Sequence, residues 1–259
     1  MDQQLLDGLP VAGIVLVFVL VALLTYELAF RVGRWWQNRT PEVDEEGPGG
    51  VLVGSLLALM AFLLAVTMGM AADRFDTRRA LVLAEANAIG TTYLRAGYLP
   101  TPAGEETRLL LREYVPLRIS TADADLLAAN IERSVEIQRD LWAFAEEVAR
   151  SAPSDVIALY IESLNEVIDL HESRITAGIY ARVPETVLLL LLGGAVLSLA
   201  IVGYNAGLSR RRSLISAVVL VIALGAVLAL VVDLDRPQGG VLRVSQQPLI
   251  DLQQQIGPP

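Results

Sequence analysis

The sequence predicts an all-α membrane protein with four transmembrane helices and an extramembrane helical bundle inserted between the second and third spans. Hydrophobic residues make up 54% of the 259 residues, and the mean hydropathy of +0.51 is too high for an ordinary soluble domain. A spanning helix needs about 20 apolar residues. Such stretches occur at 10–30, 51–70, 187–204 and 214–232. Lipid offers the backbone no hydrogen-bond partner, so each stretch must be helical.

These stretches set the predicted segment boundaries. In chain order the prediction is an N-terminus with the first transmembrane helix at 1–31, a flexible loop at 32–50, the second transmembrane helix at 51–72, the helical bundle at 73–183, the third transmembrane helix at 184–207, a basic loop at 208–213, the fourth transmembrane helix at 214–232 and a C-terminal tail at 233–259.

The first stretch is predicted to be a retained span and not a signal peptide. No Arg precedes it, and it is longer than the apolar core of a signal peptide. Trp35 and Trp36 follow it, at the position where aromatic residues anchor a helix in the membrane interface.

Helix-breaking residues divide the polar block into helices. The second span lacks a stop signal at Met70, so its helix is expected to continue to about Leu94. Further helices are expected to be capped by Thr101 and to end before Pro116, to be capped by Ser120 and Thr121, and to start at Pro153, with a break at Pro184 before the third span. In the tail, 241–245 alternates like a short strand, and 249–256 is amphipathic, suited to packing on the bundle.

Arginine in the short loops predicts the orientation. Arg31, Arg34 and Arg39 follow the first span, and 210–212 between the third and fourth spans is all Arg. The positive-inside rule puts these loops in the cytoplasm, and therefore both termini and the helical bundle outside it.

Composition excludes several functions. The chain has no Cys and no Lys, which removes disulfides, thiolate chemistry and lysine Schiff bases. The net charge of −9 argues against a nucleic-acid partner. No nucleophile–base pair or metal-ligand pattern occurs, so neither an enzyme nor a cofactor is predicted.

One candidate polar site centres on His171, the only histidine. Glu166, Asp169 and Glu172 lie at helical spacings from it, as a metal site or a pH switch would require. Because no second strong ligand is present, a histidine bonded to a neighbouring carboxylate is the simpler interpretation, and no metal is predicted.

Glu85 and Asn87 complete that candidate polar site. Both lie in a segment of alternating small and polar residues with Gly90. A buried network from Glu85 to Arg95, or around Asn87, would fix the register of the bundle.

A charged collar is predicted where the second and fourth spans end on the same side of the membrane. The ends carry Asp73, Asp76 and Arg78, and Asp233 and Asp235. The charges could surround a pore mouth or bind a cation. Interfacial ion pairs that fix helix depth are the alternative, and the mixed signs favour it.

The spans themselves contain few polar residues, which argues against a proton-coupled transporter. Small residues recur four positions apart at Gly50 and Gly54, Gly203 and Gly207, and Gly225 and Ala229. Such spacings suit close helix packing or self-association.

Several motifs resemble the bacterial bestrophin-like family of unknown function. They are DRFDTRR and EANAIG within 73–95, NEVIDLH at 165–171, DLDRP at 233–237 and RVSQQP at 243–248. The resemblance implies a multi-pass protein of the bacterial inner membrane, similar to the bestrophins, which are pentameric anion channels with four spans per subunit.

The resemblance also implies pore-lining residues. The second span of bestrophins lines a narrow apolar neck, and here one helix face would present Leu59, Leu63, Val66 and Met70. Two departures are visible. The Arg-rich loops put the termini outside, whereas bestrophins keep theirs in the cytoplasm, and no calcium-binding acidic cluster matches.

Two functions remain open at this point. The leading hypothesis is a homo-oligomeric, channel-like protein in contact with membrane lipid that passes ions, with anions favoured. The alternative is a non-conducting membrane sensor or scaffold whose helical domain binds a ligand or a protein partner.

Overall fold

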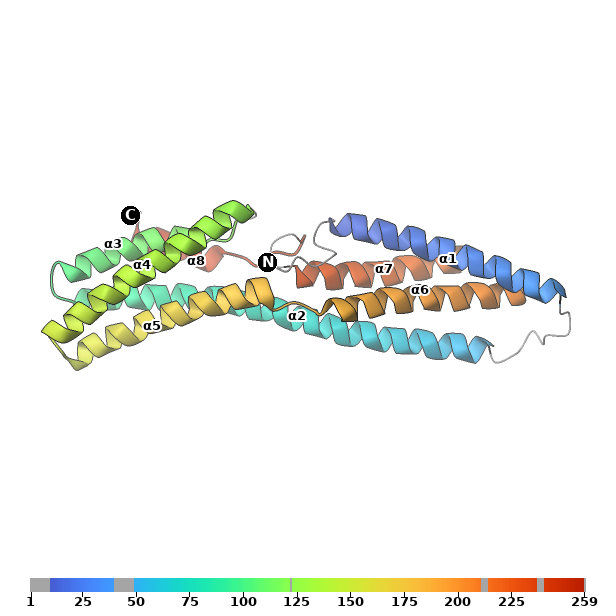
Figure 1. The fold of residues 1–259 in the computed structure, drawn as a ribbon, viewed down its shortest axis with the longest axis horizontal. Helices are drawn as coiled ribbons and strands as arrows, with labels where there is room; N and C mark the ends of the chain where they lie inside the picture. The colour runs from blue at the N-terminus through green and yellow to red at the C-terminus, as the bar shows by residue number, and fades with distance from the viewer. Residues whose placement is uncertain (1–9, 40–48, 122, 211–213, 237–239, 259) are drawn as a thin grey trace. The chain divides into compact units, whose positions relative to one another are not determined.

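The structure is a computed structural model of the 259-residue chain, and it describes residues 10–39, 49–121, 123–210, 214–236 and 240–258. All regular elements in these residues are helices (Figure 1). They are α1 (Val11–Arg39), α2 (Gly49–Arg95), the 3-10 helix η1 (Ala96–Tyr98), α3 (Ala103–Leu117), α4 (Ala124–Ser151), α5 (Asp155–Ile175), the π-helix η2 (Thr176–Tyr180), α6 (Glu185–Leu208), α7 (Leu214–Asp235) and α8 (Gln247–Ile256).

The predicted fold class is confirmed in its main part. Four helical stretches are long and apolar enough to cross a membrane, Val11–Arg39, Gly50–Tyr98, Asp155–Leu208 and Leu214–Asp235. The chain divides into two compact units. The membrane unit consists of 1–73 and 182–236, and the polar unit consists of 74–181 and 237–259.

Glycines control the packing of α1 on α6 in the membrane unit. Gly203 and Gly207 of α6 lie against the backbone carbonyls of Tyr26 and Phe30 in α1, and Gly33 of α1 lies against the carbonyl of Tyr204. A Cβ at any of the three would overlap backbone. Of the predicted small-residue pairs, this one makes the close crossing, whereas nothing lies within 4 Å of a Cβ added at Gly50 or Gly54.

Helix α2 joins the membrane unit through one narrow face. Met60 and Leu64 belong to the same buried cluster as Leu191, Ala195 and Leu199 of α6. Most other positions of α2 in this unit remain exposed. Where α7 ends, the carboxylate of Asp235 accepts a 2.7 Å hydrogen bond from the backbone N–H of Val183.

The polar unit is a helical bundle with a continuous apolar core. The second half of α2, together with α3, α4, α5 and α8, contributes buried residues, among them Ile89, Leu111, Ile137, Leu164 and Leu249. The tail helix α8 is held there by its apolar face and by a 2.8 Å hydrogen bond from Arg112 Nε to the carbonyl of Ile256. The expected packing of 249–256 on the bundle is therefore present.

Several predicted boundaries were wrong. Helix α1 continues to Arg39 and α2 begins at Gly49, so both ends of the flexible loop expected at 32–50 are helical, and its middle part, 40–48, lies outside the described residues. Likewise, α7 extends past 232 to Asp235. In both cases the helix continues into polar sequence, because hydropathy marks the lipid-compatible stretch and not the end of the hydrogen-bonded helix.

Two predicted helix ends also moved. Helix α3 continues through Pro116 to Leu117, because the proline lies in the last turn, which closes with a 3.0 Å bond from Arg118 N to the Val115 carbonyl. The N-cap of α4 is Asp123, whose carboxylate accepts from the N–H groups of Asp125 and Leu126.

The strand expected at 241–245 is not formed. These residues are irregular, and the described part of the chain contains no other strand with which they could pair. The expected break at Pro184 is present, since α6 begins directly after it at Glu185.

Candidate functional site

The centre of the polar unit is a fully buried carboxylate held by two arginines. Glu85 lies on the core-facing stripe of α2, with Val82 and Ile89 about one turn to either side. Its Oε1 accepts a 2.7 Å bond from Arg118 Nε, and its Oε2 accepts from Arg174. One negative charge therefore faces two positive charges in a site removed from water.

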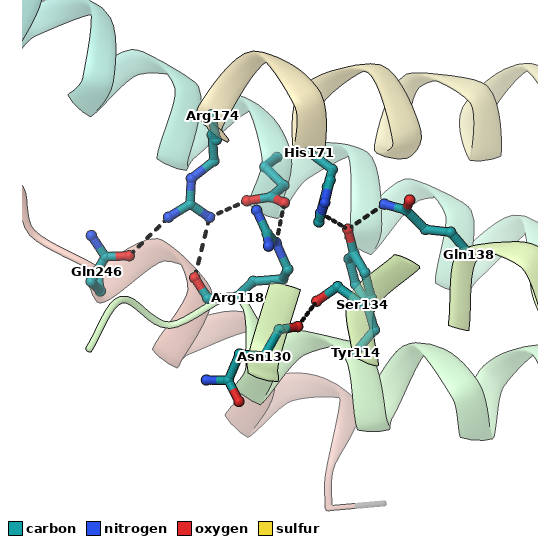
Figure 2. A network of polar contacts seen from close by, with 9 residues as sticks. Tyr114, Arg118, Asn130, Ser134, Gln138, His171, Arg174 and Gln246 are labelled. Carbon is teal, nitrogen blue, oxygen red and sulfur yellow. Dashed lines mark hydrogen bonds and ion pairs between the residues drawn. The ribbon is translucent and has the colours of Figure 1, made fainter. Parts of the chain in front are cut away.

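Arg174 also connects the C-terminal segment to this centre. Its guanidinium donates to the backbone carbonyl of Arg118 at 3.3 Å and to the side-chain oxygen of Gln246 at 3.2 Å. Figure 2 shows Arg174 reaching between the end of α3 and the segment before α8. The carboxylate of Glu85 thus joins three helices, and Arg174 adds a fourth segment.

A second set of polar contacts lies beside the first. The amide of Gln138 donates to the Tyr114 oxygen at 2.9 Å, and that hydroxyl lies 3.2 Å from Nδ1 of His171 (Figure 2). Which of these two groups donates depends on the tautomer of the histidine, and the other ring nitrogen, Nε2, is buried with no hydrogen-bond partner among the described residues. The Arg118 guanidinium lies 5.8 Å above the Tyr114 ring and connects the two sets.

Burial keeps this second set uncharged. Desolvation, reinforced by the positive charges of Arg118 and Arg174 against the opposing effect of Glu85, lowers the pKa of His171 to about 4. Burial likewise raises the pKa of the Tyr114 hydroxyl, although Arg118 counteracts part of that shift. His171 is therefore neutral at neutral pH.

Acid should destabilise the polar unit through His171. The unfolded histidine has a pKa of about 6.5 and the folded one about 4. Between these values the unfolded chain binds a proton that the folded chain does not. The contribution of His171 to the free energy of unfolding is fully present above pH about 6.5. It falls by about 3 kcal/mol as the pH falls to about 4. Thermal unfolding across this range, followed by Trp142 fluorescence in a background with Trp35→Phe and Trp36→Phe, measures the loss.

The matched variant is His171→Gln, which can still hydrogen-bond to Tyr114 in either direction but does not titrate. Its unfolding temperature should fall less steeply with acid than that of the native chain. Equal slopes for the two proteins would contradict the assignment of this pH dependence to His171.

A cavity of about 190 Å³ lies next to this network, within the polar unit. Four arginines line it, Arg78, Arg118, Arg174 and Arg243. Ser120 and Thr121 contribute hydroxyl groups, and most of the remaining wall is aliphatic.

The structure brings together only part of the predicted polar site. His171 and Glu85 lie in the same buried network, whereas Asn87 is exposed on α2. The expected partners were wrong. Glu85 pairs with Arg118 and Arg174, while Arg95 donates to the Leu159 carbonyl at 2.6 Å. His171 contacts Tyr114 and not a neighbouring carboxylate, because the carboxylates near it in sequence lie on more exposed faces of α5.

Sequence reasoning missed Tyr114, Arg118, Gln138, Arg174 and Gln246. One signal was available, since Glu85 interrupts an apolar stripe and a buried carboxylate requires cations. Nothing in the sequence says which of the 20 arginines supply them.

Of the predicted pore-lining and collar residues, only Arg78 lines the cavity beside the network. Leu59, Val66 and Met70 are exposed on α2 and Leu63 is half-buried. Of the collar, Asp73 and Asp76 are exposed, whereas Arg78, Asp233 and Asp235 are buried. In the described residues no group of three His, Asp or Glu side chains could hold a metal ion.

Comparison with known proteins gives a family and a fold. Residues 15–249 match the model of a protein family whose description is Bestrophin-like domain. Two crystal structures of a bacterial bestrophin homologue from Klebsiella pneumoniae, each with one substitution, match with TM-scores of 0.69 at 15% and 16% identity, covering 93% of this chain and 97% of theirs. A zinc-phased structure of a homologue from the same organism gives 0.59. No protein with curated annotation matches.

Proposed function

This chain belongs to the bestrophin-like family, and from that premise we propose that it is one subunit of a homo-oligomeric channel that conducts anions across a bacterial inner membrane. The observation that carries the proposal is the family match over 15–249, because bestrophins are a channel family and are known as anion channels. Four candidate spans and an all-helical fold similar to bacterial bestrophin homologues agree with it.

Helix α2 supplies the wall of the proposed pore. Met60 and Leu64 attach α2 to α6, and a different face carries Leu59, Leu63, Val66 and Met70. In a ring of subunits this second face would form an apolar constriction, a kind of barrier that gates by losing its water. The exposure of three of these four side chains in the single chain supports the assignment.

The polar unit is proposed to lie outside the membrane, on the extracytoplasmic side. Its helices α3, α4 and α5 carry charged residues along their lengths, which hydrocarbon would not accept. The Arg-rich loops after the first span and before the fourth favour the cytoplasm, which places the polar unit opposite. At the mouth of the pore, Asp73 and Asp76 are the exposed charges of the proposed collar.

Single-cysteine variants of this Cys-free chain test the function. Protein reconstituted in planar bilayers under a KCl gradient should conduct with a reversal potential near that of chloride. The variant Val66→Cys should lose conductance when a charged thiol reagent reacts with it. Asn87→Cys, exposed in the polar unit, should react with an impermeant reagent added to intact cells.

Leu64→Cys is the matched control, because its side chain packs against α6 and should not react. Absence of conductance together with a monomeric mass in detergent would reject the channel. A non-conducting sensor or scaffold would then be the better interpretation. Reaction at Asn87→Cys only after the cells are opened would reverse the orientation.

A further inference from the structure

The last turns of α1 carry exposed arginines on the same side as an exposed apolar row. Trp35 and Asn38 continue the line of that row along the helix, and Arg34 and Arg39 flank it, all four exposed. The Arg39 guanidinium lies 4.1 Å from the centre of the Trp35 ring. The row itself consists of leucines one turn apart that are each more than half exposed, Leu20, Leu24 and Leu28. This side of α1 is therefore apolar along the span and basic at its end.

A third arginine reaches the same place from α6. The crossing of α1 with α6 brings their last turns together, since a Cβ added at Gly207 would lie 2.8 Å from the backbone nitrogen of Arg34. Just beyond, Arg210 Nη2 donates a 3.2 Å hydrogen bond to Asn38 Oδ1. Arg210 has a φ of 53°, in the left-handed region where glycine usually follows a helix, and it is the one non-glycine residue in the described ranges with a positive φ. An arginine at this position costs backbone free energy that glycine would not, which indicates a use for its side chain.

The charge of this basic patch, defined as Arg34, Arg39 and Arg210, is not neutralised by neighbouring carboxylates. Arg31, one turn before, pairs with Glu27 at 2.9 Å, whereas among the described residues none of the three patch arginines has a carboxylate partner. The C-terminal ends of α1 and α6 each supply about −0.5 of an elementary charge. About two positive charges therefore remain at the end of a membrane span, where the phosphate groups of lipids lie.

We propose that the basic patch binds the head group of an anionic diacyl phospholipid, with one acyl chain along the leucine row. The phosphate oxygens accept charge-assisted hydrogen bonds from Arg34 and Arg210, whose planar guanidinium groups suit a phosphodiester. Trp35 lies beside them, at the depth where indole rings anchor helices. The row from Leu20 to Leu28 spans about 12 Å, which fits within the roughly 15 Å of one leaflet. A zwitterionic phospholipid presents the same phosphate but brings its own cation, so it leaves the charge of the patch in place.

Quenching of tryptophan fluorescence by brominated lipid tests the proposal, because the patch lies beside its own reporters. In a Trp142→Phe background only Trp35 and Trp36 of α1 emit. The full chain is reconstituted in mixed vesicles of phosphatidylglycerol and phosphatidylcholine, with one or the other brominated near the head-group end of its acyl chains. Brominated phosphatidylglycerol should quench as though its local concentration exceeded its share of the vesicle by at least about five-fold. Glycerol phosphate, which has the head group without acyl chains, should not displace it.

Three substitutions separate a built site from general charge effects. Arg210→Gln should lower the preference for phosphatidylglycerol about five-fold. Asn38→Ala keeps every charge but releases the Arg210 side chain, and should lower the preference about two-fold. Arg139→Gln removes the same charge from an exposed position of α4 in the polar unit and should leave the preference unchanged. Equal losses in Arg210→Gln and Arg139→Gln, or a preference that survives Arg210→Gln, would overturn the assignment.

Acids in 40–48, outside the described residues, are the competing partners of the patch, and they are Glu42, Asp44, Glu45 and Glu46. A native chain without the preference that acquires it when these four become amides would assign the neutralisation to the protein itself and overturn the proposal. Tryptophan fluorescence that neither brominated lipid quenches would show that another subunit covers this side of α1, which also overturns it. The readout is independent of whether the oligomer conducts.

Discussion

Replacing Glu85 by Gln is expected to destabilise the polar unit by about 3–5 kcal/mol. The change removes the charge that Arg118 and Arg174 share and leaves two guanidinium groups facing each other in a buried site. The glutamine side chain has an NH₂ group in place of one carboxylate oxygen. That group would face a guanidinium N–H, and two donors facing each other repel. Denaturant unfolding of the detergent-solubilised chain, followed by Trp142 fluorescence in a background with Trp35→Phe and Trp36→Phe, measures the loss.

Glu113→Gln provides the control for loss of one carboxylate. Glu113 pairs with Arg133, and both side chains are more than a third exposed, so solvent screens the pair and its loss should change stability far less than the loss at Glu85. Converting Glu85, Arg118 and Arg174 together to apolar residues should restore most of the stability, because no charge is then left unpaired. If Glu85→Gln lowers the free energy of unfolding no more than Glu113→Gln does, the buried ion pairs of Glu85 with Arg118 and Arg174 stabilise the protein no more than an exposed pair.

Gly203→Val is expected to separate α1 from α6 and to cost several kcal/mol of stability in the membrane unit. The added side chain would meet the backbone carbonyl of Tyr26, which cannot move aside as a flexible side chain can. Overpacking in a well-packed core typically costs about 1–3 kcal/mol, and contact with backbone places this position at or above that range. Thermal unfolding of a Trp142→Phe background, in which only Trp35 and Trp36 of α1 report, measures it.

Gly193→Val on the same helix is the matched control. Nothing lies within 4 Å of a Cβ added at Gly193, and valine is a better helix former than glycine. This variant should therefore unfold at or above the native temperature. An equal loss at both positions would assign the effect to the spans in general and not to the crossing of α1 with α6.

Local physics let the sequence determine the spans and most helix positions. An apolar run in lipid has only its own backbone for hydrogen bonds, so it must be helical wherever its neighbours lie. Proline and glycine act on their own turn, and for that reason the break at Pro184 could be predicted. The predicted end of α3 at Pro116 and the predicted start of α4 were wrong. In each case a hydrogen bond between residues close in sequence sets the observed helix end, at Leu117 for α3 and at the cap Asp123 for α4.

The tertiary structure alone decided the polar site. Glu85 meets Arg118 and Arg174 across sequence separations of 33 and 89 residues, and Tyr114 meets His171 across 57. Which arginine reaches a buried carboxylate depends on how four segments cross, and no local pattern carries that information. The same reason separates Gly203 from Gly50, since both have the small-residue spacing but only Gly203 lies against another backbone. The sequence thus set what must be buried, and the helix crossings set which partners it found.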